Sequence, residues 1–187
     1  MRRLMRTVVL LAVVVATVVL FIRSDRIEQM MYPIHYREDI RASASNYKVD
    51  PYLLAAIIRS ETNYQTGRES SKGALGIMQI MPDTADWIID QANFTSVTMD
   101  DIHHRADVSI EMGSWYIHSL SKQFDQNTIA AVAAYNAGPG NVKRWMSEQV
   151  WDGTLDQLSD VPFGETRHYV KRVFYYYEKY KSLYPTL

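Results

Sequence analysis

The sequence contains no cysteine, and this absence excludes several chemistries together. Disulfide bonds, thiolate nucleophiles and cysteine-ligated zinc sites all require a residue that this chain lacks. Because a chain without cysteine is compatible with either side of a membrane, the absence does not identify the compartment in which the protein works.

An excess of charge of one sign is missing as well. The 187 residues include 20 Lys and Arg and 21 Asp and Glu, which leaves a formal net charge of -1 at pH 7. No overall field therefore attracts nucleic acid, and we expect no nucleic-acid partner. Affinity has to come from a shaped site, and the length allows one domain of ordinary size with a tail.

The five histidines lack a metal-binding pattern. No two of them stand four residues apart with an acid between them, as the HExxH pattern of zinc enzymes requires. We therefore expect neither a metal nor another cofactor.

One long apolar run is present, at the N-terminal end. It covers residues 7–22, follows three arginines and precedes Arg23 and Asp25. This pattern is typical of a secretion signal or a signal anchor, and the absence of a small-residue cleavage site after the run favours an uncleaved anchor. As a helix the run reaches roughly 24 Å, short of a hydrocarbon core of roughly 30 Å unless the flanking arginines extend to the interface.

The anchor divides the chain into two parts. We expect residues 1–32 to form a cytoplasmic tip, the anchor as a transmembrane helix, and a short polar stalk, and residues 33–187 to form the folded domain. Basic residues flank the run on both sides, so their distribution alone does not choose an orientation.

Patterns typical of strands are missing after the anchor. Apolar residues recur at helical spacing, and the breaks fall where Gly, Pro, Asn and Asp cluster, so we predict an all-α domain. Asp50 before Pro51 is typical of a helix start. Four tyrosines stand at helical spacing in and directly after the last predicted helix, and we expect them to pack in the core rather than to form a carbohydrate platform: Tyr169, Tyr176, Tyr180 and Tyr184. The predicted helices cover residues 36–48, 51–63, 82–92, 105–123, 127–137, 141–150 and 164–183.

Glu61 is the first candidate for chemistry. It shares one helix face with three apolar residues, Leu54, Ile57 and Ile58. Burial against hydrocarbon raises the pKa of a carboxyl group, which allows Glu61 to act as a general acid near neutral pH. Alternatively, Glu61 turns into solvent or pairs with Arg59 or Arg68.

Two glycine-containing segments add polar side chains. Residues 73–82 follow Ser71 and contain Met78 and Gln79, whose amide can both donate to and accept from a sugar hydroxyl. Residues 133–142 end a helix at a Gly-Pro-Gly turn, which places Tyr135 and Asn136 beside a cleft, with Asn141 as a cap for the next helix. The alternative is that the glycines serve only the turns and that Asn136 only caps carbonyls.

Four motifs together resemble the soluble-lytic-transglycosylase (SLT) type catalytic domain, a relative of goose-type lysozyme. They are IIRSETNY around Glu61, GALGIMQIMPDTA at residues 73–85, AYNAGPGNV at residues 134–142 and ETRHYVKRV at residues 165–173. The resemblance covers about residues 40 to 180 and implies a lysozyme-like helical domain. Thr62 replaces the serine usual after the catalytic glutamate, and Ser109 stands where the family commonly has asparagine.

The resemblance implies a peptidoglycan lytic transglycosylase with glycan strands as its partner. Such an enzyme cleaves the β-1,4 bond between N-acetylmuramic acid and N-acetylglucosamine and leaves a 1,6-anhydromuramoyl end. It implies Glu61 as the catalytic acid and base. The anchored domain would face the cell wall, outside the cytoplasm, while no protein partner is indicated. The residues expected to bind substrate are Ser71, Met78, Gln79, Tyr135, Asn136, Glu165 and Tyr169.

Two other functions remain open at this point. A lysozyme-type muramidase would need a second carboxylate about 5 to 9 Å from the first. The chain offers four acids for that role: Asp50, Glu69, Asp83 and Glu165. A membrane-tethered glycan-binding module would need no acid on an apolar helix face, and the presence of Glu61 argues against that function.

Overall fold

The structure is a computed structural model that describes residues 2–22 and 25–187, and its regular elements there are helices. Extended pairing in these residues is limited to two isolated bridges, Glu69 with Leu75 and Leu75 with Ile80. The prediction of an all-α domain is confirmed. The elements in chain order are α1 (Arg2–Ile22), α2 (Asp25–Met31), α3 (Arg37–Tyr47), α4 (Pro51–Glu61), α5 (Pro82–Ala92), α6 (Met99–His104), α7 (Ala106–Gln123), α8 (Thr128–Ala137), α9 (Pro139–Ser147), a 3-10 turn (Leu158–Asp160) and α10 (Gly164–Leu183).

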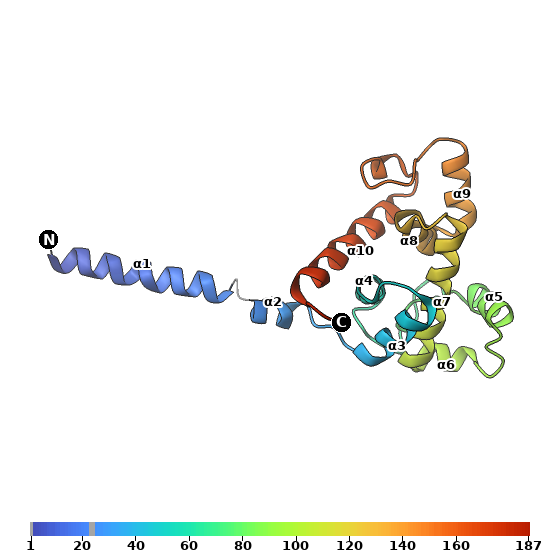
Figure 1. Cartoon of the computed structure of the whole chain (residues 1–187), viewed down its shortest axis with the longest axis horizontal. Coiled ribbons are helices and arrows are strands. Elements are labelled where there is room, and N and C mark those ends of the chain that lie inside the picture. The colour runs from blue at the N-terminus through green and yellow to red at the C-terminus, as the bar shows by residue number, and fades with distance from the viewer. Residues whose placement is uncertain (1, 23–24) are drawn as a thin grey trace.

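Helix α4 lies in the centre of the domain and contacts α3 and α10 (Figure 1). Its residues 53–58 are all buried, which is the pattern of a helix that is covered all round. Asp50 caps its start, as predicted, by accepting a hydrogen bond of 2.8 Å from the backbone N–H of Tyr52. The helix ends at Glu61, so the last residue of the central core helix carries the candidate acid.

The long helix α7 forms the second part of the scaffold. It contacts α3, α5, α6 and α8, while α8 also contacts α9 and α10. Figure 1 shows α8 beside the first half of α10, with α9 continuing from α8 toward the outside of the domain. Helices α4, α8 and α10 are therefore fixed relative to one another, because α10 contacts both α4 and α8.

Two helix predictions need correction. Helix α6 was not predicted from the sequence, because it has only 6 residues and too few apolar positions to show a period. Helix α9 begins at Pro139 rather than at residue 141, because the fixed φ of proline suits the first helical position. Asn141 is therefore inside the helix, where its Nδ2 donates to the Ala137 carbonyl over 2.7 Å, and it does not cap the start.

The tyrosines of α10 pack largely as predicted. Tyr169, Tyr180 and the following Tyr184 are buried, and Val173 between them is buried as well. Tyr176 is only partly buried, and its ring stacks on Tyr180 at a centroid distance of 6.3 Å. This helix closes one side of the core.

The N-terminal helix α1 extends away from the domain in Figure 1, and its large apolar side chains between Met5 and Val19 are exposed. Within the part of the chain that the structure describes, no helix has the length and the apolar character needed to cross a membrane. The expected transmembrane helix is thus not confirmed.

The expected stalk is helical and docks on the domain. Lys179 of α10 forms an ion pair of 2.7 Å with Glu28 of α2, and Nε2 of Gln29 donates to the Leu183 carbonyl over 2.7 Å. The Tyr184 hydroxyl donates to the Tyr32 carbonyl over 2.9 Å. Helix α2 and the residue after it are therefore packed against the C-terminal end of α10.

Candidate active site

A cleft lies where the C-terminal ends of α4 and α8, the first turn of α10 and the loop before α5 meet. The side chains expected to form the site largely come together there. Those that line this cleft are Glu61, Ser71, Gln79, Tyr135, Asn136 and Glu165. The sequence interpretation did not single out four further lining residues, which all belong to the loop: Ser70, Lys72, Ala74 and Met81.

Glu61 is largely covered by protein in this cleft and receives one strong hydrogen bond. The hydroxyl of Tyr169 donates to its Oε1 over 2.7 Å. Burial raises the pKa of Glu61 from 4.5 to about 7, while the hydrogen bond from Tyr169 and the positive charge of Arg172 lower that pKa and the charge of Glu165 raises it. Near neutral pH the carboxyl group is therefore divided between its protonated and ionised forms.

The alternative pairing of Glu61 with Arg59 is excluded by the contacts of that arginine. Arg59 donates to the side chain of Asn63 and to the Met31 carbonyl, and its guanidinium lies 5.5 Å from the ring centroid of Tyr176. Among the described residues Glu61 forms no ion pair within 4.0 Å. Its pKa is consequently controlled by burial rather than by a salt bridge.

Arg172 was missed in the sequence. It stands three residues after Tyr169, and its guanidinium lies 5.8 Å from the centroid of that ring. Glu165, Tyr169 and Arg172 follow one another at spacings of four and three, which places them on one face of α10. This helical spacing was the available signal for Arg172.

Tyr135 lines the cleft without contacting Glu61 through its hydroxyl. That hydroxyl donates to the Met78 carbonyl over 2.9 Å, and its ring lies 5.3 Å from the ring of Tyr116. Burial raises the pKa of Tyr135 and of Tyr169 well above the ordinary value, so both remain neutral donors. The side-chain hydrogen bond to the Glu61 carboxyl group comes from Tyr169 instead.

The side chain of Met78 lies in the core rather than in the cleft. It is fully buried and fills the space left by Gly113, where an added Cβ would lie 2.3 Å from the Met78 sulfur. Met81 lines the cleft in its place. The correction arises because the loop is not helical, so the sequence gives no period from which to assign its inward side chains.

The loop before α5 is fixed by hydrogen bonds and by a glycine that has no room for a side chain. Thr62 donates from its Oγ1 to the Ile77 carbonyl over 2.8 Å. Gly76 has a φ of +72°, and an added Cβ would lie 2.0 Å from the Ile102 carbonyl oxygen. Gln79 donates from Nε2 to the carbonyls of Gly76 at 2.9 Å and Arg68 at 3.1 Å. The loop therefore presents a rigid wall to the cleft.

The opposite wall is tied together by side chains of α8 and α10. The Thr166 hydroxyl donates to Oδ1 of Asn136 over 2.8 Å, which links the end of α8 to the first turn of α10. Glu165 forms an ion pair of 2.9 Å with Lys72, and both side chains are exposed. The pair connects the loop to α10 at the rim of the cleft.

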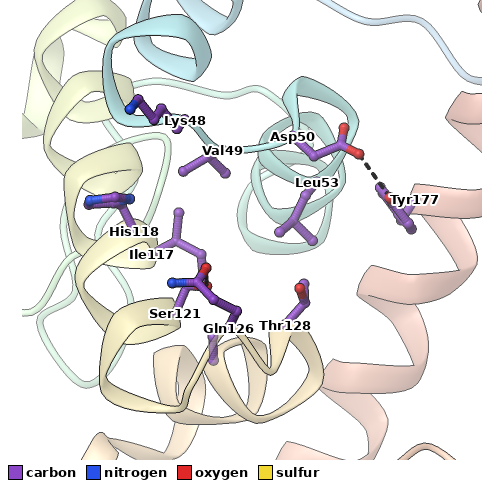
Figure 2. A pocket seen from close by; sticks show the side chains of 11 residues that line it. Lys48, Val49, Asp50, Leu53, Ile117, His118, Ser121, Gln126, Thr128 and Tyr177 are labelled. Atoms are coloured by element: carbon purple, nitrogen blue, oxygen red, sulfur yellow. Dashed lines mark hydrogen bonds between the residues drawn. The ribbon is translucent and has the colours of Figure 1, made fainter.

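Another cavity lies at the opposite end of α4 and contains a different acid, Asp50 (Figure 2). Asp50 accepts hydrogen bonds from the Tyr52 backbone and, over 2.8 Å, from the Tyr177 hydroxyl. Its carboxylate is thus used to cap the helix. Glu165 is the one other acid that lines the Glu61 cleft within the described residues.

Residues 38–157 match the family model described as the transglycosylase SLT domain. The soluble lytic murein transglycosylase of Escherichia coli K12 is 31% identical over 160 residues, which cover 84% of this chain and 24% of that protein. The membrane-bound lytic murein transglycosylase C of Edwardsiella ictaluri is 28% identical over 159 residues, covering 74% of this chain and 44% of that protein.

Solved structures of the same kind share the fold. The 70-kDa soluble lytic transglycosylase of Escherichia coli aligns with a TM-score of 0.77 and 29% identity, over 83% of this chain and 25% of that chain. An inactive glutamate-to-glutamine mutant of the lytic transglycosylase Slt of Pseudomonas aeruginosa aligns with a TM-score of 0.74 and 30% identity, over 83% and 25%. The chain thus spans about a quarter of the length of these soluble relatives. On the match over residues 38–157 and the shared helical fold, this chain belongs to the transglycosylase SLT domain family.

Proposed function

We propose that this protein is a peptidoglycan lytic transglycosylase. It cleaves the β-1,4 bond between N-acetylmuramic acid and N-acetylglucosamine and leaves a 1,6-anhydromuramoyl end. The observation that carries this proposal is that Glu61 lines the cleft with a pKa raised by burial to about 7. The curated relatives that carry the name lytic murein transglycosylase support the same reaction.

In the first step the protonated Glu61 donates its proton to the glycosidic oxygen. The bond from that oxygen to C1 of the muramoyl ring breaks, and the N-acetylglucosamine part leaves as an alcohol. The hydrogen bond from Tyr169 stabilises the carboxylate that forms, and Arg172 acts in the same sense through its charge. Glu61 is the catalytic acid, and Tyr169 positions it.

In the second step the Glu61 carboxylate accepts the proton of the muramoyl 6-hydroxyl, while the oxygen of that hydroxyl bonds to C1. The carboxyl group returns to its protonated form, and no water is consumed. A pKa of about 7 suits both steps, because one group must donate and then accept a proton near neutral pH. An intramolecular hydroxyl also reacts at a high effective concentration compared with water.

The remaining cleft residues bind and orient the glycan. Ser71, Gln79 and Asn136 offer hydroxyl and amide groups for sugar hydroxyls and acetamides. Tyr135 supplies an aromatic wall, and Met78 contributes through the carbonyl that holds the Tyr135 hydroxyl. The residues proposed to contact the glycan are therefore Ser71, Gln79, Tyr135, Asn136 and Glu165, whereas Met78 supports Tyr135 and Tyr169 positions Glu61.

The test is the origin of the oxygen at C1 of the product. Purified peptidoglycan is digested in water enriched in heavy oxygen, and the released muropeptides are analysed by mass spectrometry. We expect no solvent oxygen at C1, and products lighter by one water than those of a lysozyme. Labelled reducing ends would identify a muramidase instead, and binding without any release would identify a glycan-binding module.

We further propose that residues 1–32 attach the protein to the cell membrane, and that residues 33–187 form the catalytic domain on the side of the cell wall. The large apolar side chains of α1 between Met5 and Val19 are exposed, and such a surface is unfavourable in water. The membrane-bound name of one curated relative is consistent with this location.

The attachment is tested in the full-length protein with one substitution in α1. Val14→Arg places a charge in the middle of the apolar helix, and Val14→Leu is the matched control. We expect the wild type and Val14→Leu to fractionate with membranes and Val14→Arg to be released. Protease added to spheroplasts, in which only the cytoplasmic membrane is closed, should reach the domain, whereas a domain protected there would refute the proposed orientation.

A further inference from the structure

A groove lies next to the cleft, between α5, α7 and the start of α9. Its lining combines aromatic and polar side chains, and the proposed function has not used it. The residues that line it are Asp83, Thr84, Trp87, Tyr116, Gln123 and Pro139.

The groove adjoins the Glu61 cleft. Met81 lines the cleft and Asp83, two residues later, lines the groove, so their Cα atoms are at most about 7.6 Å apart. The rings of Tyr135 in the cleft and Tyr116 in the groove lie 5.3 Å apart. One chain segment and one aromatic pair therefore lead directly from the proposed active site to the groove.

Trp87 is the unusual feature of this groove. Its side chain is 40% exposed, whereas Trp145 and Trp151 are 2% and 1% exposed in the core. The indole packs on Trp115 at 5.5 Å and on Tyr116 at 6.1 Å between ring centroids. Two aromatic neighbours thus hold the indole in place although much of its surface is in water, which is an arrangement typical of a binding surface.

The polar residues around Trp87 match the hydroxyl and acetamide groups of a sugar. Asp83 offers a carboxylate acceptor, Thr84 offers a hydroxyl, and Gln123 offers an amide whose oxygen accepts from Lys143 over 3.0 Å. An aromatic plane packs against the C–H face of a pyranose ring while such groups bind its edge. A lipid or an apolar peptide would instead leave the carboxylate of Asp83 without a partner.

We propose that Trp87 forms an additional binding site for a sugar residue of the same β-1,4-linked N-acetylhexosamine strand that occupies the cleft. The proposal rests on the proposed function, because it assigns the groove to the same substrate. Contact with Trp87 would make long glycan strands better substrates than short oligosaccharides.

Binding is measured first, in the full-length chain with Glu61→Gln so that no cleavage occurs. Oligomers of N-acetylglucosamine are titrated, and affinity is followed by calorimetry as a function of oligomer length. We expect Trp87→Ala to weaken binding of the long oligomers roughly tenfold, with a much smaller effect on the short ones. Trp87→Phe should restore most of the affinity, because it keeps an aromatic plane.

Tyr175→Ala is the matched control. Tyr175 is an aromatic residue of α10 that is 55% exposed and does not line the groove. It should leave the length dependence unchanged. Equal affinities of Trp87→Ala and the control for every oligomer would overturn the proposal.

Cleavage is then measured with Glu61 intact, using glycan strands of different length. In Trp87→Ala the KM for long strands should rise roughly tenfold, with little change in kcat. A fall in kcat that is equal for all lengths would indicate a structural role and overturn the proposal. A wild type that binds oligomers through Trp87 but cleaves no strand would refute only the transglycosylase function.

Discussion

The hydroxyl of Tyr169 donates a hydrogen bond of 2.7 Å to Glu61 across 108 positions of the sequence. Burial of Glu61 favours the protonated carboxyl group, whereas this hydrogen bond and Arg172 favour the carboxylate. The opposition places the pKa at about 7, so that either form is accessible to a reaction near neutral pH. The contribution of the Tyr169 hydroxyl to the pKa of Glu61 can be tested by a single substitution.

Replacing Glu61 by glutamine should abolish most of the activity. The amide is nearly isosteric with the carboxyl group but cannot transfer the proton, so we expect kcat to fall by roughly 10² to 10⁴. Glu111→Gln is the matched control, since Glu111 also accepts a hydrogen bond from a tyrosine, Tyr47 at 3.1 Å, but does not line the cleft. The assay measures the release of muropeptides. If Glu61→Gln turned over substrate nearly as fast as the wild type, Glu61 would not be the catalytic acid.

The same substitution should change how stability depends on pH. Because the pKa of Glu61 is about 7 in the folded protein and 4.5 in its ordinary state, the folded protein binds the proton more tightly than the unfolded one. The stabilisation is complete below about pH 4.5 and is lost as the pH rises to about 7. Above pH 7 the ionised buried group costs up to about 3 kcal/mol.

Urea unfolding between pH 4.5 and 8 measures this effect. We expect Glu61→Gln to be less sensitive to rising pH than the wild type, and Glu111→Gln to follow the wild type. Parallel curves for all three proteins would show that the pKa of Glu61 is not raised by folding.

Removing the Tyr169 hydroxyl should move the pH profile. Tyr169→Phe deletes a hydrogen bond that lowers the pKa of Glu61, so this pKa should rise further, and the loss of activity on the basic side should occur at higher pH. Loss of a hydrogen bond to the charged form should also reduce kcat at neutral pH by roughly tenfold. In the control Tyr135→Phe the basic limb should keep its position, since that hydroxyl bonds to Met78. A basic limb that moves to lower pH in Tyr169→Phe would contradict the assigned role.

We expect glycine-to-alanine substitutions in and near the cleft to differ in their cost to the stability of the fold. Gly76→Ala should destabilise the fold by several kcal/mol, because its Cβ would lie 2.0 Å from the Ile102 carbonyl oxygen at a φ of +72°. Gly73→Ala has a φ of +84° but open space and should cost about 1 kcal/mol. Gly140→Ala, in a helix with open space, should be neutral or slightly stabilising.

Thermal unfolding of the three variants gives this order directly. Equal melting temperatures for Gly76→Ala and Gly140→Ala would mean that the loop can open without cost. The wall that it presents to the cleft would then not be rigid.

Short sequence patterns predicted the positions of most helices. The cap at Asp50 and Pro51 marks the start of α4, and the apolar spacing before Glu61 indicates that the helix is buried. These features involve residues only a few positions apart, so they can be recognised from residue type and from the helical spacing of apolar residues. Thr98 and Asp101 form a capping box at α6 and would have revealed that helix, although its length is too short for a period.

Contacts between distant segments were beyond local signals. The pairing of Tyr169 with Glu61 depends on how α10 crosses α4, which no spacing within either helix specifies. Met78 was expected in the cleft, where Met81 lies instead, because the backbone between them is irregular, with a φ of +50° at Gln79. The resemblance to a family indicated which segments meet, and the structure determined which atoms touch.

Helix α10 lies outside the range matched by the family model and is made more than a hundred residues after the end of α4. During synthesis from the N-terminal end, Glu61 therefore emerges long before Tyr169 and Arg172. Until the last helix docks, the side chain is an ordinary exposed carboxylate with a pKa near 4.5 and is ionised at neutral pH. The carboxyl group with the pKa that the proposed reaction needs therefore exists only after α10 has docked against α4.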